Sequence, residues 1–243
     1  MSTLKDGFIF TLLKKYTNTF MHLIYPNQCL VCLNELPESN RTNICHLCQD
    51  NFHFTYFETS DSTRLDKLFW GRLNIHSTFS LLEFEKQNST QKILHAIKYK
   101  SNKLLAGEMG KKIGNTIHQK SNFATIEVLI PVPLHIKKKY IRGYNQSEVI
   151  AEGVNTILNV QLKPNLIKRT IHSESQTKKN KFSRWDNVKD VFQIDISALK
   201  KFNHIAIIDD VITTGSTIEA ITLKIHKEIP DLKISIISLA IAK

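Results

Sequence analysis

The most constraining feature of this chain is residues 205–220, IAIIDDVITTGSTIEA, which predict a strand, a tight loop and a helix in succession. The apolar run ends in two adjacent carboxylates, Asp209 and Asp210, and a turn rich in glycine and hydroxyl groups follows. A helix start offers free backbone N–H groups and the positive end of the helix dipole, and both suit a phosphate. Paired carboxylates accept hydrogen bonds from vicinal hydroxyls or ligate a hard cation such as Mg²⁺. The segment therefore predicts a site for a phosphate beside a polyhydroxylated sugar.

This pattern resembles the phosphoribosyl pyrophosphate (PRPP) motif of the type I phosphoribosyltransferases. The resemblance implies that Asp209 and Asp210 are the catalytic acids and contact the ribose hydroxyls. It also implies that the turn binds the 5′-phosphate through Thr213, Thr214, Gly215, Ser216 and Thr217. The alternative is an ordinary strand end followed by a helix with a Ser/Thr cap.

All four cysteines lie in one short stretch as two CxxC pairs, Cys29 with Cys32 and Cys45 with Cys48. Two such pairs can complete the tetrahedral four-thiolate site that is typical of structural zinc, with no position left open for catalysis. Disulfides are the competing interpretation, but nothing in the sequence indicates export to an oxidising compartment. A redox CxxC is less favoured because the two pairs are matched.

The rest of the chain predicts two parts. Residues 1–57 form an N-terminal helix and the double zinc-knuckle module, a polar linker follows, and residues 68–243 form the main domain. Apolar strands at residues 79–84, 128–130, 205–208 and 232–241 alternate with amphipathic helices that begin near residues 89, 104, 145 and 216. This alternation predicts an α/β fold with a parallel sheet flanked by helices, whose ligands bind at the carboxyl ends of the strands.

A second segment, residues 130–152, predicts a strand, a proline-fixed turn, a basic stretch and a helix start. Together with the PRPP motif and the cysteine pairs, it resembles the ComF family, competence-associated relatives of the phosphoribosyltransferases. The family elements V-P-L-x(n)-R-G-F/Y-N-Q and R-x(6)-Q-x(7)-R-x-x-N both occur, and a helix leading into K-Y/F precedes them. They are matched by Val132, Pro133, Leu134, Arg142, Gly143, Tyr144, Asn145 and Gln146, by Arg169, Gln176, Arg184 and Asn187, and by Lys98 and Tyr99.

The net charge of +11 favours an anionic partner, because basic loops attract phosphates on small molecules or along a nucleic acid. Within the basic stretch up to residue 184, we expect nucleic-acid contacts from Lys178, Lys179, Lys181 and Arg184, with Tyr144 and Trp185 available to stack on bases. A solvated surface that only confers solubility is the alternative.

The resemblance implies a PRPP site that works with Mg²⁺, in which Lys98 and Arg142 hold the pyrophosphate. It implies a ComF-like competence protein that acts on incoming single-stranded DNA in natural transformation, with the competence machinery as partner. The alternative is an active phosphoribosyltransferase of nucleotide salvage, which converts PRPP and a nitrogen base to a nucleotide and pyrophosphate. No segment predicts a base pocket, so the acceptor and catalysis itself stay open.

The sequence also predicts a cytoplasmic protein that does not insert into membranes. No apolar stretch approaches the roughly 20 residues that cross a bilayer. The short FIFTLL run near the N-terminus is followed by lysines instead of a signal-peptide cleavage site.

Overall fold

The computed structural model describes residues 26–37, 39–40, 42–56, 63–169 and 191–243. The chain divides into two compact units, Met1–Asn51 and Phe52–Lys243. The division therefore lies a few residues earlier than residue 57, where the sequence analysis ended the zinc module.

The second unit is built on a five-stranded sheet in which every pair of neighbours is parallel. Its two longest strands are apolar runs rich in isoleucine, and most of their residues are buried because helices cover both faces. The order across the sheet is β1 (Ser77–Phe84), β7 (Lys233–Ala242), β6 (His204–Ile212), β2 (Val128–Pro131) and β3 (Gln161–Leu162).

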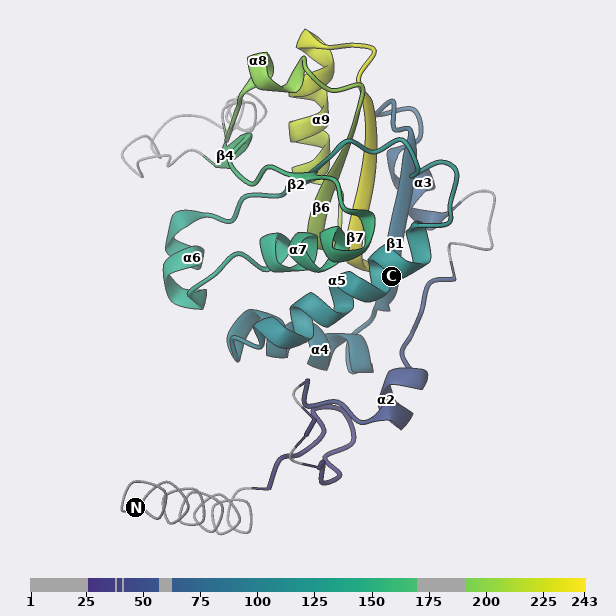
Figure 1. The fold of residues 1–243 in the computed structure, drawn as a ribbon, viewed down its shortest axis with the longest axis vertical. Coiled ribbons are helices and arrows are strands. Elements are labelled where there is room, and N and C mark those ends of the chain that lie inside the picture. Colours follow the sequence, from purple (N-terminus) through teal and green to yellow (C-terminus); the bar gives the residue numbers. More distant parts are fainter. Residues whose placement is uncertain (1–25, 38, 41, 57–62, 170–190) are drawn as a thin grey trace, which may run out of the picture. The chain divides into compact units, whose positions relative to one another are not determined.

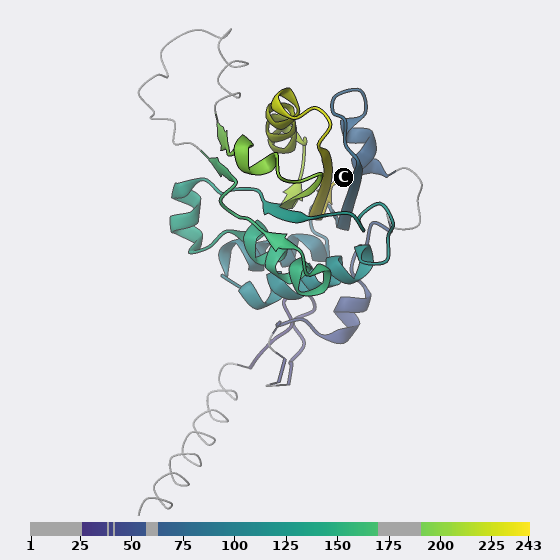
Figure 2. The same ribbon diagram turned by 45° about the horizontal axis from the view of Figure 1, so that its top comes forward.

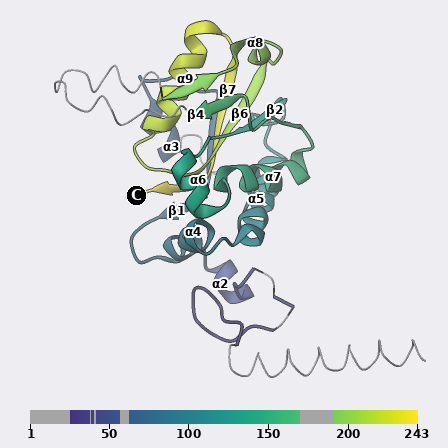
Figure 3. The same cartoon turned by 90° about the vertical axis from the view of Figure 1, so that its left-hand side faces the viewer.

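Two layers of helices enclose this sheet (Figures 1 and 3). One face carries α4 (Ser89–Tyr99), α5 (Lys103–Ile117) and α7 (Gln146–Leu158). On the other face a continuous apolar core joins the sheet to α3 (Arg64–Phe69), α9 (Ser216–Glu228), α8 (Ile196–Leu199) and the hairpin of β4 (Ile167–Arg169) with β5 (Phe192–Ile194). Figure 2 shows the same layers from another direction, with the sheet between them. The predicted α/β architecture with a parallel sheet is thus confirmed.

The chain leaves the two central strands in opposite directions. After β2 it passes through α7 to β3 at one edge of the sheet, whereas after β6 it passes through α9 to the neighbouring β7 on the other side. The loops at the carboxyl ends of β2 and β6 therefore diverge. Ligands of open parallel sheets bind at such a switch point.

Some local predictions need correction. Strand β6 continues to Ile212, so Asp209 and Asp210 lie inside the strand and not after its end. The second half of the predicted polar linker forms α3, because Thr63 and Asp66 make a reciprocal capping box at its start. The basic stretch after β2 is also helical, as α6 (Ile136–Arg142), and ends at Gly143 in the left-handed conformation.

The first unit is small. Its described residues contain a single helix, α2 (His46–Asp50), and an isolated bridge between Gln28 and Glu35. Its buried apolar residues in that part of the chain are Cys29, Leu36 and Ile44. Small modules that bury as few apolar residues as this described part does commonly depend on a disulfide or a metal for stability.

Candidate functional site

The acid pair lies on β6, the central strand, next to the switch point. The Oδ1 atom of Asp209 accepts hydrogen bonds from the Ser147 hydroxyl on α7 at 3.1 Å and from the backbone N–H of Asp210 at 2.8 Å. The Oδ2 atom of Asp210 lies 3.2 Å from the ammonium of Lys98 on α4, and both of these side chains are mostly buried. Two helices that are distant in sequence thus meet the same pair of carboxylates.

The electrostatics of this pair favour a cation. Burial and the negative charge of Asp210 raise the pKa of Asp209 to about 7, although the two hydrogen bonds and Lys98 act in the opposite direction. Near neutral pH the site therefore carries more negative charge than its neighbours compensate. A divalent ion with a preference for oxygen ligands would relieve that repulsion.

The turn after β6 leads directly into α9. Gly215 adopts φ +76° as the residue before the helix, and a Cβ there would lie 2.7 Å from the Phe69 ring on α3, so both conformation and packing require glycine. The hydroxyls of Thr214 and Ser216 lie 2.8 Å apart at the exposed edge of the turn. Gly215 gives α9 no side-chain cap, and the Ser216 N–H donates to the Thr214 hydroxyl oxygen only at the long distance of 3.5 Å. The start of the helix therefore suits an anion.

A ring of contacts connects these elements around the acid pair. Next to Lys98 on α4 is Tyr99, and the guanidinium of Arg142 at the end of α6 lies 5.4 Å from the centre of the Tyr99 ring. Arg142 also donates from Nη1 to Oε1 of Gln146 on α7, at 2.9 Å. The next residue, Ser147, donates to Asp209 and closes the ring.

The predicted site residues are therefore brought together in part. Lys98 is in direct contact with Asp210, the neighbour of Asp209, and Arg142 is connected to Asp209 through Gln146 and Ser147. Ser147 was not among the predicted site residues. Its position directly after the matched N-Q motif was the signal that pointed to it.

Of the residues predicted to contact nucleic acid, the structure describes only Tyr144. Tyr144 is only 5% exposed and donates its hydroxyl to the backbone oxygen of Ile97, so its ring is not available for stacking. Burial, with the nearby charge of Asp210, also raises the pKa of Tyr144 to about 12. The other predicted contacts, Lys178, Lys179, Lys181, Arg184 and Trp185, lie outside the described residues.

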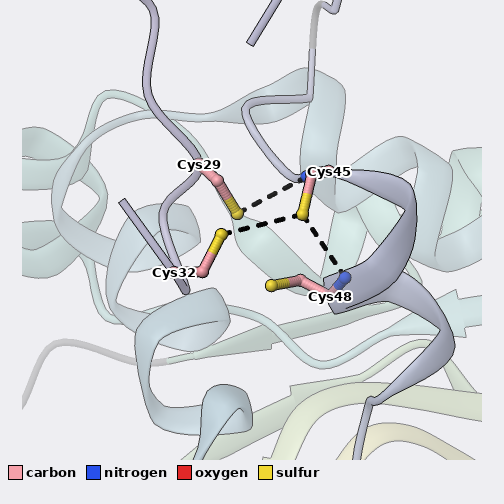
Figure 4. Close-up of side chains that lie close together, drawn as sticks. All are labelled: Cys29, Cys32, Cys45 and Cys48. Carbon is pink, nitrogen blue, oxygen red and sulfur yellow. Dashed lines mark hydrogen bonds between the residues drawn. The ribbon is translucent and has the colours of Figure 1, made fainter. Parts of the chain in front are cut away.

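The four cysteines form a second candidate site, within the first unit (Figure 4). None is in a disulfide, and all four sulfur atoms lie within 4.8 Å of one another. The Sγ atoms of Cys32 and Cys45 are 3.7 Å apart. Zinc–sulfur bonds of about 2.3 Å in a tetrahedron separate the sulfurs by roughly 3.8 Å, so the cluster fits a zinc ion.

Backbone N–H groups also point at the sulfurs, as expected for thiolates. The Sγ atom of Cys29 accepts from Val31 at 3.4 Å and from Cys45 at 3.5 Å, and that of Cys45 accepts from Cys48 at 3.4 Å. Burial opposes ionisation of Cys29, but hydrogen bonds from the backbone N–H groups of Cys32, Cys45 and Val31 and from the Cys32 thiol outweigh it. They lower the pKa of the Cys29 thiol to about 6. The donor set and its surroundings therefore suit a thiolate-bound metal.

Among the helices in the described part of the chain, none has the length and apolar character to cross a membrane.

Comparison with known proteins shows which proteins the chain is similar to. No family model matches it. It is similar to Competence protein F of Haemophilus influenzae, with 33% identity over 102 residues, which is 42% of this chain and 44% of that protein. It is also similar to the DNA utilization protein YhgH of Escherichia coli O157:H7, with 32% identity over 93 residues, and of Shigella flexneri, with 31% identity over the same length.

Each match covers less than half of the relative: 44% of Competence protein F and 40% of each YhgH protein. The resemblance that the motifs predicted is nevertheless confirmed by these similarities, which join the chain to competence and DNA utilization proteins. Over the aligned part, the chain is thus similar to Competence protein F, in agreement with its resemblance to the ComF family.

Proposed function

We propose that this chain is a ComF-like competence protein with a phosphoribosyltransferase-type fold, which binds PRPP together with Mg²⁺ and acts on incoming single-stranded DNA in natural transformation. A cytosolic location goes with this role, because the transported strand emerges there. The single observation that carries the proposal is the acid pair on β6, held by Lys98 and Ser147 directly before an uncapped helix start.

Each part of PRPP has a chemical counterpart around this pair. The ribose hydroxyls would donate to the carboxylates of Asp209 and Asp210. The 5′-phosphate would lie on the first turn of α9 and accept from the backbone and hydroxyl groups of residues 213–217. Lys98 and Arg142 would supply positive charge for the pyrophosphate.

The same residues suit Mg²⁺, which takes oxygen ligands and binds through one or two carboxylates plus substrate phosphates. Asp209 and Asp210 would hold it, and the ion would neutralise charge on the pyrophosphate. In this state Lys98 would exchange its contact with Asp210 for one with a pyrophosphate oxygen. Positioning and charge stabilisation are what such a site contributes to displacement at the ribose carbon.

The DNA part of the proposal rests on the relatives. Their printed names are Competence protein F and DNA utilization protein YhgH, and the chain shares about a third of its aligned residues with them. The excess of basic residues in this chain agrees with a polyanionic partner.

Calorimetric titration of PRPP with Mg²⁺ tests the ligand. We expect micromolar binding to the wild type and its loss in the double variant Asp209→Asn, Asp210→Asn. The control is Asp231→Asn, which removes an exposed carboxylate from the turn before β7 and should bind as the wild type does. Absence of binding to folded, zinc-loaded wild type would contradict the PRPP site.

A second measurement separates the proposal from nucleotide salvage. The wild type is incubated with PRPP, Mg²⁺ and single nitrogen bases, and released pyrophosphate is measured. Turnover with one free base, without affinity for single-stranded DNA, would assign the chain to salvage. Ligand binding without turnover, together with DNA binding, is the expected result.

A further inference from the structure

A basic and aromatic surface lies beside the acid pair, on elements that contribute only Lys98 and Arg142 to the proposed PRPP site. We call it the α6 ridge. It comprises α6, the C-terminal end of α4 and the start of α5, which meet where the Ser101 hydroxyl donates to the backbone oxygen of Arg142 at 3.4 Å. Its members are Tyr99, Lys100, Lys103, Lys137, Lys138, Lys139, Tyr140, Ile141 and Arg142.

The ridge is uniformly positive. Residues 86–107 contain five lysines, residues 132–147 contain three lysines and an arginine, and neither segment contains an acidic residue. Lys100, Lys103, Lys138 and Lys139 are exposed. A row of like charges costs stability through repulsion unless an anion lies against it.

The ridge also exposes rings and aliphatic side chains that a folded protein normally covers. No residue of α6 is buried, Tyr140 is 91% exposed and Ile141 is 78% exposed. Tyr99 is 64% exposed, with the Arg142 guanidinium on its ring and the ring of His95 5.0 Å away. Exposed tyrosines among lysines and an arginine are the composition of a surface that stacks bases and tracks a phosphate backbone.

We propose that the α6 ridge is the surface that binds single-stranded DNA, with Lys138 and Lys139 on the phosphates and Tyr140 stacked on a base. The inference rests on the DNA-handling part of the proposed function and names where in the chain it takes place. It assigns the contact to residues other than Lys178, Lys179, Lys181 and Arg184.

A single strand fits this surface better than a duplex, because only unpaired bases present a free face to a tyrosine ring. Position adds a second argument. The ridge is joined to the acid pair through Arg142, Gln146 and Ser147 on one side, and through Tyr99 and Lys98 on the other. A strand on the ridge therefore lies next to the PRPP site, and its phosphates would compete with or complement the charge of the pyrophosphate.

Binding of a fluorescently labelled 20-nucleotide oligo(dT) to the full-length, zinc-loaded protein tests the charges. We expect Lys138→Gln, Lys139→Gln to lower the affinity and to reduce the slope of log K against log salt by about 1.4, since each phosphate contact on a single strand contributes about 0.7. The matched control is Lys200→Gln, Lys201→Gln, an adjacent exposed pair at the end of α8, which should leave the slope unchanged.

Substitution of Tyr140 tests stacking. Tyr140→Ala should weaken binding about 5- to 150-fold, while Tyr140→Phe, which keeps the ring, should bind as the wild type does. Because Tyr140 is almost fully exposed, neither variant should alter folding, and unchanged zinc content and thermal unfolding will verify this.

The possible outcomes distinguish a failure of the α6 ridge from a failure of the proposed DNA role. If the wild type binds DNA and both lysine pairs weaken it equally, or neither does, the α6 ridge is wrong while the DNA role stands. If the wild type does not bind DNA at all, the DNA role fails as well. Binding to vesicles of phosphatidylglycerol and phosphatidylcholine that is lost in the ridge variants, without DNA binding, would overturn the inference in favour of a membrane surface.

Discussion

At the scale of single residues, the buried charge of Asp209 destabilises the fold, and the same charge is proposed to bind Mg²⁺. Its carboxylate is packed next to a second acid, and its two hydrogen bonds do not offset burial, so its pKa rises to about 7. A group whose pKa is raised on folding stabilises the fold at low pH and loses that contribution as the pH rises through the folded value. The charge that would bind Mg²⁺ therefore weakens the ligand-free protein at neutral pH.

Asp209→Asn should accordingly stabilise the ligand-free protein. Asparagine can accept the same hydrogen bonds from Ser147 and Asp210 but carries no charge. We expect its advantage in free energy of unfolding to grow by roughly 2–3 kcal/mol from pH 5 to pH 7 and to level off above that. Urea unfolding at pH 5, 6, 7 and 8 measures this, with Asp231→Asn as control. A gap that does not change with pH would contradict the charge argument.

At the scale of elements, the close contact of α5 and α7 positions one wall of the site. Gly110 on α5 packs so closely on α7 that an added Cβ would lie 2.2 Å from the backbone oxygen of Ile150. A Cβ added at Gly153 on α7 would likewise lie 2.2 Å from the backbone oxygen of Gly107. Because α7 begins with the residues that contact Arg142 and Asp209, this glycine contact sets where Ser147 lies.

Two alanine substitutions on α5 separate packing from helix propensity. Gly110→Ala should destabilise the protein by about 2–4 kcal/mol, because the new methyl group meets backbone that cannot move aside. Gly107→Ala meets open space and should stabilise by up to about 1 kcal/mol, the difference in propensity between the two residues. Chemical unfolding of both variants measures this, and equal effects would refute the packing argument.

At the scale of the whole molecule, the two units depend on different forces. The second unit buries a large apolar core, whereas the described part of the first buries few apolar residues and holds four clustered cysteines. Metal binding can supply folding free energy that such a small core lacks. We propose that one structural zinc ion holds the first unit and that the second folds without it.

Cys45→Ser should therefore abolish zinc binding and unfold the first unit alone. Elemental analysis should give one zinc per wild-type chain purified under reducing conditions and none for the variant. Limited proteolysis should then cut within residues 1–51, while residues 63–243 keep the unfolding temperature of the wild type. Wild-type protein without zinc, or loss of both units in the variant, would contradict this division.

The sequence by itself determined the elements whose patterns are local. The isoleucine-rich strands, the amphipathic helices α4, α5, α7 and α9, and the CxxC pairs all follow from neighbours in the chain. The motif around Asp209 and Asp210 was equally visible, because the strand, the acids and the glycine turn are contiguous. Helix α3 was not predicted, although Thr63 and Asp66 have the spacing of a capping box, which indicates a helix start.

Only the tertiary structure decided what lies together across long stretches of sequence. The contact of Lys98 with Asp210, the hydrogen bond of Ser147 to Asp209 and the burial of Tyr144 each depend on how α4 and α7 cross the sheet. The angle at which helices cross is set by how their side chains pack, and here Gly110 lets α5 approach α7 closely. No local sequence pattern encodes such an angle. For the same reason the sequence could show that α6 is basic, but only the fold placed it beside the acid pair.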